Sequence, residues 1–147
     1  MADAPRILIV TSRYYANIMT ELEASVAEGL EKVGATYEFL EVPGAFEIPA
    51  AISMAASTGE WDGFVALGCV IRGETSHYDL VAGESCRGLM ELGIRRGACI
   101  GNGILTVENE AQALARANPR GQDKGGGAAA AALSLLTWRR RLGARAT

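Results

Sequence analysis

The only histidine of the chain, His77, closes the run RGETSH at residues 72–77, where the greatest variety of reactive side chains gathers. An imidazole with an unperturbed pKa of about 6.5 can accept and donate protons near neutrality. If a helix begins here, its free backbone N–H groups and the positive end of its dipole favour a bound phosphate or carboxylate. The run therefore predicts a site that binds an anion and transfers protons. A plain capped turn is the alternative, with Thr75 or Ser76 as the cap and a capping box from Ser76 to Asp79.

This run lies between two elements that must position it. Residues 64–67 are continuously apolar and lead through Gly68 into Cys69, Val70 and Ile71, which is typical of a strand covered on both faces. A helical pattern begins at about Tyr78 and is expected to place Leu80, Val81, Cys86, Leu89 and Met90 on one side. The histidine is thus predicted at the carboxyl end of a strand, where open α/β sheets bind ligands.

The rest of the chain alternates strands and helices in the same way. Further strands are predicted at 7–10, 37–42 and about 98–107, the last bent or bulged by its glycines, Gly101 and Gly103. Helices are predicted at about 17–33, 47–57, 108–117 and 128–142, with a loop at 118–127. This order predicts a three-layer α/β/α sandwich of the flavodoxin-like kind, with a four-stranded, mainly parallel sheet.

Composition indicates one globular domain over residues 1–147 and excludes several classes of protein. Hydrophobic residues make up 49% of the chain and charged residues 21%, which suits a packed core and not disorder. A net charge of −3 argues against nucleic acid as a partner, and no apolar run reaches the roughly 18 residues of a membrane span. The start, MADAPRILIV, is no signal peptide. The three cysteines lack CxxC spacing and are interpreted as reduced core residues of a cytoplasmic protein, without a metal.

Candidate binding residues follow each of the first three predicted strands. Tyr14 and Tyr15 follow the first, residues 44–47 the second and residues 72–77 the third. Because the carboxyl ends of parallel strands share one edge of a sheet, the three loops are expected to converge. An aromatic ring, an acid and a histidine would then line one crevice.

These residues also have ordinary structural explanations. Tyr14 can cover the core, Glu47 can favour a helix dipole, and Arg116 can be a solvated surface charge. Lys124 is expected just before a helix N-terminus, where a cation is unfavourable. A cation kept there could collect an anion, and Arg116 could supply a bidentate clamp for phosphate.

Four motifs together carry a resemblance to a known family. VPGAFEIP at 42–49, IRGETSH at 71–77, GNGILTVEN at 101–109 and Lys124 before the last helix resemble the lumazine synthases over essentially the whole chain. The resemblance implies the condensation of 5-amino-6-ribitylaminouracil with 3,4-dihydroxy-2-butanone 4-phosphate in riboflavin biosynthesis. It also implies that no cofactor or metal is needed and that subunits assemble as pentamers or larger shells, with sites between adjacent subunits. Riboflavin synthase is a possible partner.

The resemblance implies roles for residues of this sequence on the pyrimidine side of the site. Tyr14 would stack on the pyrimidine, backbone amides of Ala45 and Phe46 would hold the ring and ribityl chain, and Glu47 would accept hydrogen bonds from ribityl hydroxyls. Three strand residues would border the pyrimidine, namely Cys69, Val70 and Ile71.

It implies roles on the phosphate side as well. His77 would move protons between the reacting groups, and Gly73, Glu74 and Thr75 would cradle the substrate phosphate. The neighbouring subunit would contribute Asn102, Arg116 and Lys124, with Arg116 as the cationic partner of the phosphate. The sequence departs from the commoner family pattern at Tyr14 and Tyr15, often Phe and Asn, at Asn102, often aromatic, and at Gly127, often Glu.

Two other classes of protein fit parts of the pattern. A non-catalytic oligomeric carrier could hold a lumazine or flavin in the same pocket without turnover. A flavodoxin-like signalling domain would need a phosphorylatable Asp after the first strand, where this chain has TSRYY. Because storage needs neither a proton shuttle nor a phosphate clamp, the presence of His77, Thr75 and Arg116 favours an enzyme.

Overall fold

The apolar runs pair into one parallel sheet, which a computed structural model describes for residues 4–145. The strand order is β2-β1-β3-β4, and all three strand pairs are parallel. The predicted sandwich with a four-stranded parallel sheet is therefore confirmed. The elements are β1 (Arg6–Ser12), α1 (Ala16–Lys32), β2 (Thr36–Val42), the 3₁₀ turn η1 (Ala45–Glu47), α2 (Ile48–Ala56), β3 (Gly63–Ile71), α3 (His77–Arg96), β4 (Ile100–Val107), α4 (Glu110–Ala117) and α5 (Lys124–Leu142).

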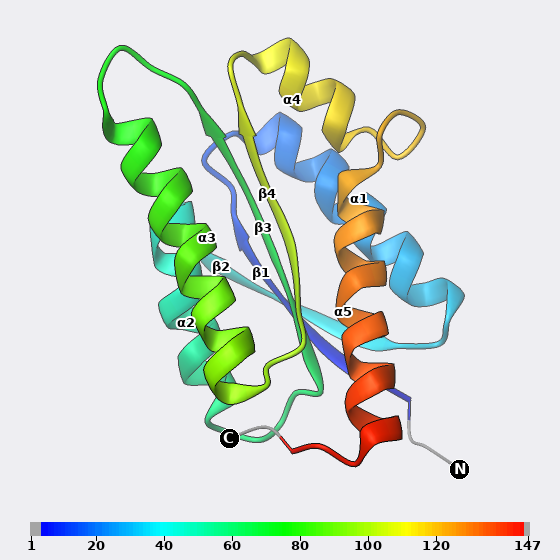
Figure 1. The fold of residues 1–147 in the computed structure, drawn as a ribbon. Coiled ribbons are helices and arrows are strands. Elements are labelled where there is room, and N and C mark those ends of the chain that lie inside the picture. The colour runs from blue at the N-terminus through cyan, green and yellow to red at the C-terminus, as the bar shows by residue number, and fades with distance from the viewer. Residues whose placement is uncertain (1–3, 146–147) are drawn as a thin grey trace.

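Helices cover both faces of the sheet, α2 and α3 on one side and α1, α4 and α5 on the other (Figure 1). Successive side chains of β1 enter opposite layers: Ile7 and Ile9 join the core beneath α1 and α5, whereas Leu8 and Val10 join the core beneath α2 and α3. A strand buried on both faces needs apolar residues at consecutive positions, which is why its sequence shows no alternation. Across residues 4–145, no helix has the length and hydrophobicity needed to cross a bilayer.

The predicted bulge in the fourth strand is wrong. β4 pairs with β3 in an unbroken register from Phe64↔Ile100 to Ile71↔Val107. Its two glycines instead allow close packing, because a Cβ on residue 101 would overlap the backbone oxygen of Ala128 in α5. A Cβ on residue 103 would lie 2.7 Å from Leu67 Cδ2. The glycines let α5 lie directly on the strand.

The last helix begins at Lys124, four residues before the predicted start at 128. Asp123 precedes it in the left-handed region, with φ 49°, and its Oδ1 accepts a hydrogen bond from the Gly126 N–H at 3.3 Å. The glycines that indicated a loop lie in the first turn. Gly125 is buried where a Cβ would come within 2.6 Å of the Leu22 backbone oxygen, so glycine permits α1 and α5 to cross closely.

The start of α3 also differs from the expectation. The predicted capping box is wrong, because Ser76 makes no side-chain capping bond and Asp79 lies 3.6 Å from Arg72 Nη1 instead. The Thr75 Oγ1 accepts a hydrogen bond from the His77 N–H at 3.3 Å. The predicted apolar side of the helix is wrong in part: Leu89 is buried, but Leu80 and Met90 are 60% and 65% exposed.

A step in the sheet sets the position of the candidate site. The register between β1 and β3 ends at Thr11↔Leu67, whereas β3 continues beside β4 to Ile71↔Val107. β3 and β4 therefore extend past the end of β1, as Figure 1 shows near the top of the view. As a consequence, residues 68–71 have a strand partner on the β4 side only.

Candidate active site

The carboxyl ends of the strands are tied together around this step. The Ser12 Oγ at the end of β1 donates to the Pro43 carbonyl after β2 at 3.4 Å. The Asn17 Nδ2 in the first turn of α1 donates to Glu110 Oε1 in the first turn of α4 at 3.0 Å. The convergence of the loops that follow β1 and β2 is thus confirmed.

Tyr14 presents its ring to solvent beside the end of β1. The side chain is 77% exposed, and its ring meets that of Tyr15 edge to face, with centroids 4.9 Å apart and planes at 83°. Tyr15 is half-buried and packs against the core, so it is an anchor for its neighbour. Burial raises the pKa of the Tyr15 phenol, which keeps it protonated. Tyr14 is therefore placed to stack on a planar ligand.

The turn after β2 lies on β3 at the step. Ala45 is buried over Gly68, where a Cβ would come within 3.4 Å of the Ala45 Cβ. This contact leaves Phe46, which is 58% exposed, and the carboxylate of Glu47 at the surface. The turn thus exposes an aromatic ring and an acid next to residues 68–71 of β3, which have no strand partner on the β1 side.

The residues of that segment are mostly buried. Cys69 and Val70 are 8% exposed and Ile71 is half-buried. Burial, with a smaller contribution from Glu110, raises the pKa of the Cys69 thiol to about 11. The thiol is therefore protonated at neutral pH and is no nucleophile. Cys69 and Cys99 are buried and Cys86 is half-buried; all three are unpaired, as expected.

The loop at residues 72–77 is exposed and is held by Arg72, to which sequence reasoning gave no role. The Arg72 Nε donates to both carboxylate oxygens of Glu108, at 3.0 and 2.9 Å, and the guanidinium lies 4.3 Å from the centre of the Tyr78 ring. The hydrogen bond that Arg72 donates to Glu108 raises the pKa of Arg72. Because Glu108 and Asp79 balance its charge, Arg72 positions the loop and leaves a bound phosphate in need of another cation.

Asn102, Arg116 and Lys124 gather in a different place. Together with residues 103–106 they line a hollow of about 180 Å³ along the open edge of β4. The Asn102 Oδ1 accepts from the Ile104 N–H at 2.9 Å, and the half-buried Arg116 donates from Nη1 to the Gln112 carbonyl at 3.1 Å. None of the residues of the first group lines this hollow. The candidate residues of one chain therefore fall into two separate groups, which we call candidate half-sites.

The hollow is small for a complete ligand site. Pockets that enclose small ligands usually measure about 300–1,000 Å³.

Within residues 4–145, no three His, Cys, Asp or Glu side chains gather as metal ligands.

Sequence comparisons identify the family. Residues 4–140 match the family model described as 6,7-dimethyl-8-ribityllumazine synthase. A protein of that name from Methylobacterium radiotolerans is 56% identical over 135 residues, which cover 92% of this chain and 82% of the relative. One from Erythrobacter litoralis is 55% identical over 139 residues, covering 95% and 99%, and one from Novosphingobium aromaticivorans is 54% identical over 136, covering 92% and 97%. The chain belongs to the 6,7-dimethyl-8-ribityllumazine synthase family, because its sequence matches both the family model and these relatives.

Proposed function

We propose that the protein condenses 5-amino-6-(D-ribitylamino)uracil with 3,4-dihydroxy-2-butanone 4-phosphate to give 6,7-dimethyl-8-ribityllumazine in riboflavin biosynthesis. The observation that carries this proposal is the step where β3 passes the end of β1. It leaves residues 68–71 without a strand partner on the β1 side, and the loops that follow β1 and β2 carry an exposed tyrosine ring and an exposed carboxylate. The names of the relatives support the same reaction, and no finding favours the carrier.

The pyrimidine substrate fits the step. Its ring edge carries amide-type donors and acceptors, which the backbone N–H and C=O groups of Cys69 and Ile71 on the open side of β3 can match as a neighbouring strand would. The backbone groups of Val70 face β4, because the Arg72 N–H two residues on bonds to the Val107 carbonyl, so Val70 borders the ring with its side chain alone. Tyr14 stacks on the ring, and the Glu47 carboxylate accepts hydrogen bonds from the ribityl hydroxyls. The buried Cys69 forms part of the apolar wall.

The phosphate of the second substrate occupies the loop before α3. Residues 73–75 are exposed and lead into a helix of 20 residues, whose N-terminus offers free N–H groups and a positive dipole end. Arg72 is already paired with Glu108. The additional cations are therefore Arg116 and Lys124, which line the hollow at β4.

The chemistry requires proton transfer at each step. The amine of the pyrimidine adds to the ketone and water leaves to form an imine; a C–H proton is then removed and phosphate departs, leaving an enol. The enol takes up a proton at its terminal carbon and becomes a ketone, which the ribityl-bearing nitrogen attacks, and a second water is lost. We assign these proton transfers to His77, which directly follows the loop proposed to hold the phosphate. Holding two reactants together supplies much of the rate.

The two half-sites meet between subunits of a homo-oligomer, a pentamer or a larger assembly. The hollow is too small to act alone, and α3 carries Leu80, Met90 and Ile94 at 60%, 65% and 75% exposure. An exposed apolar stripe of this kind is typical of a subunit interface. Cytoplasmic location, independence of cofactors and metal ions, and a downstream riboflavin synthase are parts of the proposal that follow from the family.

The direct test mixes the purified protein with both substrates and follows the absorbance of the lumazine product. We expect turnover that requires both substrates, with reactions lacking either one as controls. Turnover that survives addition of a metal chelator and needs no added cofactor supports cofactor independence. Tight binding of a lumazine or flavin without product formation would instead identify a carrier.

A further inference from the structure

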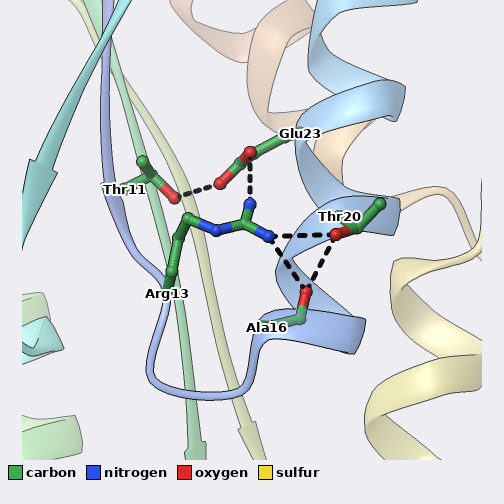
Figure 2. A network of polar contacts seen from close by, with 5 residues as sticks. All are labelled: Thr11, Arg13, Ala16, Thr20 and Glu23. Carbon is green, nitrogen blue, oxygen red and sulfur yellow. Dashed lines mark hydrogen bonds and ion pairs between the residues drawn. The ribbon is translucent and has the colours of Figure 1, made fainter.

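Arg13 is the first residue after β1, and it joins the loop that carries Tyr14 to the first turns of α1 (Figure 2). Its Nη1 donates to Glu23 Oε1 at 2.6 Å, and its Nη2 donates to Thr20 Oγ1 at 3.0 Å and to the Ala16 carbonyl at 3.4 Å. One guanidinium thus contacts three points along the same helix. These three contacts fix the distance and the orientation of the Arg13 guanidinium relative to α1.

The partner carboxylate is itself held from the sheet. The Glu23 Oε2 accepts a hydrogen bond from the Thr11 hydroxyl of β1 at 2.8 Å, and Thr11 is only 2% exposed. The side chains of Arg13 and Glu23 are 30% and 18% exposed. Because both oxygens of Glu23 are engaged, the network joins strand, loop and helix into one rigid unit.

The position of the Arg13 guanidinium near the N-terminus of α1 indicates that the network does more than stabilise the helix. A positive charge beside a helix N-terminus opposes the helix dipole, so a guanidinium is not the residue that stabilisation of α1 alone would favour there. The helix lacks the usual alternative, since Tyr15 occupies the N-cap without a side-chain capping bond and the first turn carries no acid. Arg13 is also no free anion site, because Glu23 balances its charge.

Tyr14 lies between two fixed points. Arg13 is held on one side by its guanidinium, and Tyr15 is held on the other by the core and by hydrogen bonds from the N–H groups of Ile18 and Met19 to its carbonyl, at 3.1 and 3.0 Å. The ring of Tyr14 itself is exposed. Its orientation therefore depends on the two neighbours and not on burial.

We propose that Arg13, through Glu23, is a positioning residue that fixes the Tyr14 ring for stacking on the heteroaromatic substrate. The inference rests on the proposed function. Without the network, the loop must be ordered when the pyrimidine binds, and this ordering weakens binding of that substrate alone. Residues 72–77, proposed to hold the butanone phosphate, make none of the contacts of this network, so binding of that substrate is expected to stay unchanged.

The test measures KM for each substrate in Arg13→Ala. We expect the KM for the pyrimidine to rise about tenfold, with the KM for the butanone phosphate and the thermal midpoint little changed. Arg13→Lys keeps the charge but loses the fork, so an intermediate value is expected. Arg120→Ala is the matched control, because Arg120 also pairs with a glutamate of α1, Glu28, at 3.5 Å, but far from Tyr14 in the chain.

A double-variant cycle separates positioning from general destabilisation. In a Tyr14→Ala background, Arg13→Ala should raise the pyrimidine KM no further, because the ring it positions is gone. If Arg13→Ala folds poorly, Glu23→Gln tests the same contact, because it keeps the shape of the side chain and removes its charge. It should also raise the pyrimidine KM. An unchanged pyrimidine KM in both variants, equal changes for both substrates, or additive effects with Tyr14→Ala would overturn the inference. Absence of turnover by the unaltered protein would instead overturn the proposed function.

Discussion

His77 is exposed at the first position of α3, and only its backbone N–H has a described hydrogen bond. The imidazole can therefore serve different proton transfers in turn. In a variant without it, water can take over part of this proton transfer. We predict that His77→Ala lowers kcat by about 10²-fold, near the lower end of acid–base catalysis, with little change in KM for either substrate. Steady-state rates of lumazine formation measure this. A variant that binds both substrates normally and shows no turnover would contradict the proximity argument.

Cys69 gives a prediction for thiol chemistry. With a pKa of about 11, its thiolate fraction at pH 8 is about one thousandth. Alkylation by iodoacetamide in the native protein should therefore be slow and should increase about tenfold per pH unit up to about pH 11. Mass spectrometry of labelled peptides, with urea-unfolded protein as the control, measures the rate. Native labelling at pH 8 as fast as in urea would show that the thiol is neither buried nor raised in pKa.

At the residue scale, sequence reasoning named candidate ligand-binding residues and missed the residues whose contacts hold the loop of Tyr14. Tyr14 and Glu47 were identified because reactive types follow a strand. Arg13 and Glu23 are ten positions apart and on different elements, so only the packing of α1 on the sheet brings them together. Thr11 in an otherwise apolar strand was the one available signal, since a buried hydroxyl needs a partner.

At the scale of elements, the glycines of β4 give a stability prediction. Gly101→Ala would place a methyl group against the Ala128 backbone, and overpacking of this kind destabilises by about 1–3 kcal/mol or more. Gly127→Ala is the control: it lies in the same helix as Ala128 but has open space around it, and alanine there should stabilise by up to about 1 kcal/mol. Urea unfolding measures both. Equal effects would refute a packing role for Gly101.

The element order followed from periodicity, whereas the exceptions follow from tertiary packing. Continuous apolar runs and helical spacing predicted the four strands and the helices between them. The same patterns could not show that Gly101 and Gly103 admit α5, nor that Gly125 lies inside a helix because α1 crosses there. Glycine carries no side chain, so its sequence signal is the same for a bulge, a loop and a close contact.

At the scale of the whole molecule, the exposed face of α3 predicts dependence on assembly. Met90→Glu places a charge on the stripe formed with Leu80 and Ile94, so the variant should remain folded but dissociate and lose activity at least tenfold. Sedimentation, circular dichroism and the product assay measure these three properties. Thr58→Glu, at an exposed turn after α2, is the control and should change none of them. A fully active monomer would refute the composite site.

The proposed sharing of sites between subunits makes a stronger prediction, because the two candidate half-sites can be altered separately. His77→Ala alters the first half-site, and Arg116→Ala alters the second. In an assembly that contains both variants, some interfaces join an intact His77 to an intact Arg116 of the neighbour. Random mixing leaves about a quarter of the sites wholly intact. Co-expressed and co-purified variants should therefore exceed the mean activity of the two parents.

The controls follow from the same geometry. The variants purified separately and mixed without exchange of subunits should show only the mean activity. The double variant co-expressed with either single variant should show no gain, because such an assembly contains either no intact His77 or no intact Arg116. If both groups instead acted within one chain, every subunit would carry one defect and no mixture could restore a site. Complementation therefore decides whether the hollow at β4 serves the step of a neighbouring subunit or a function of its own.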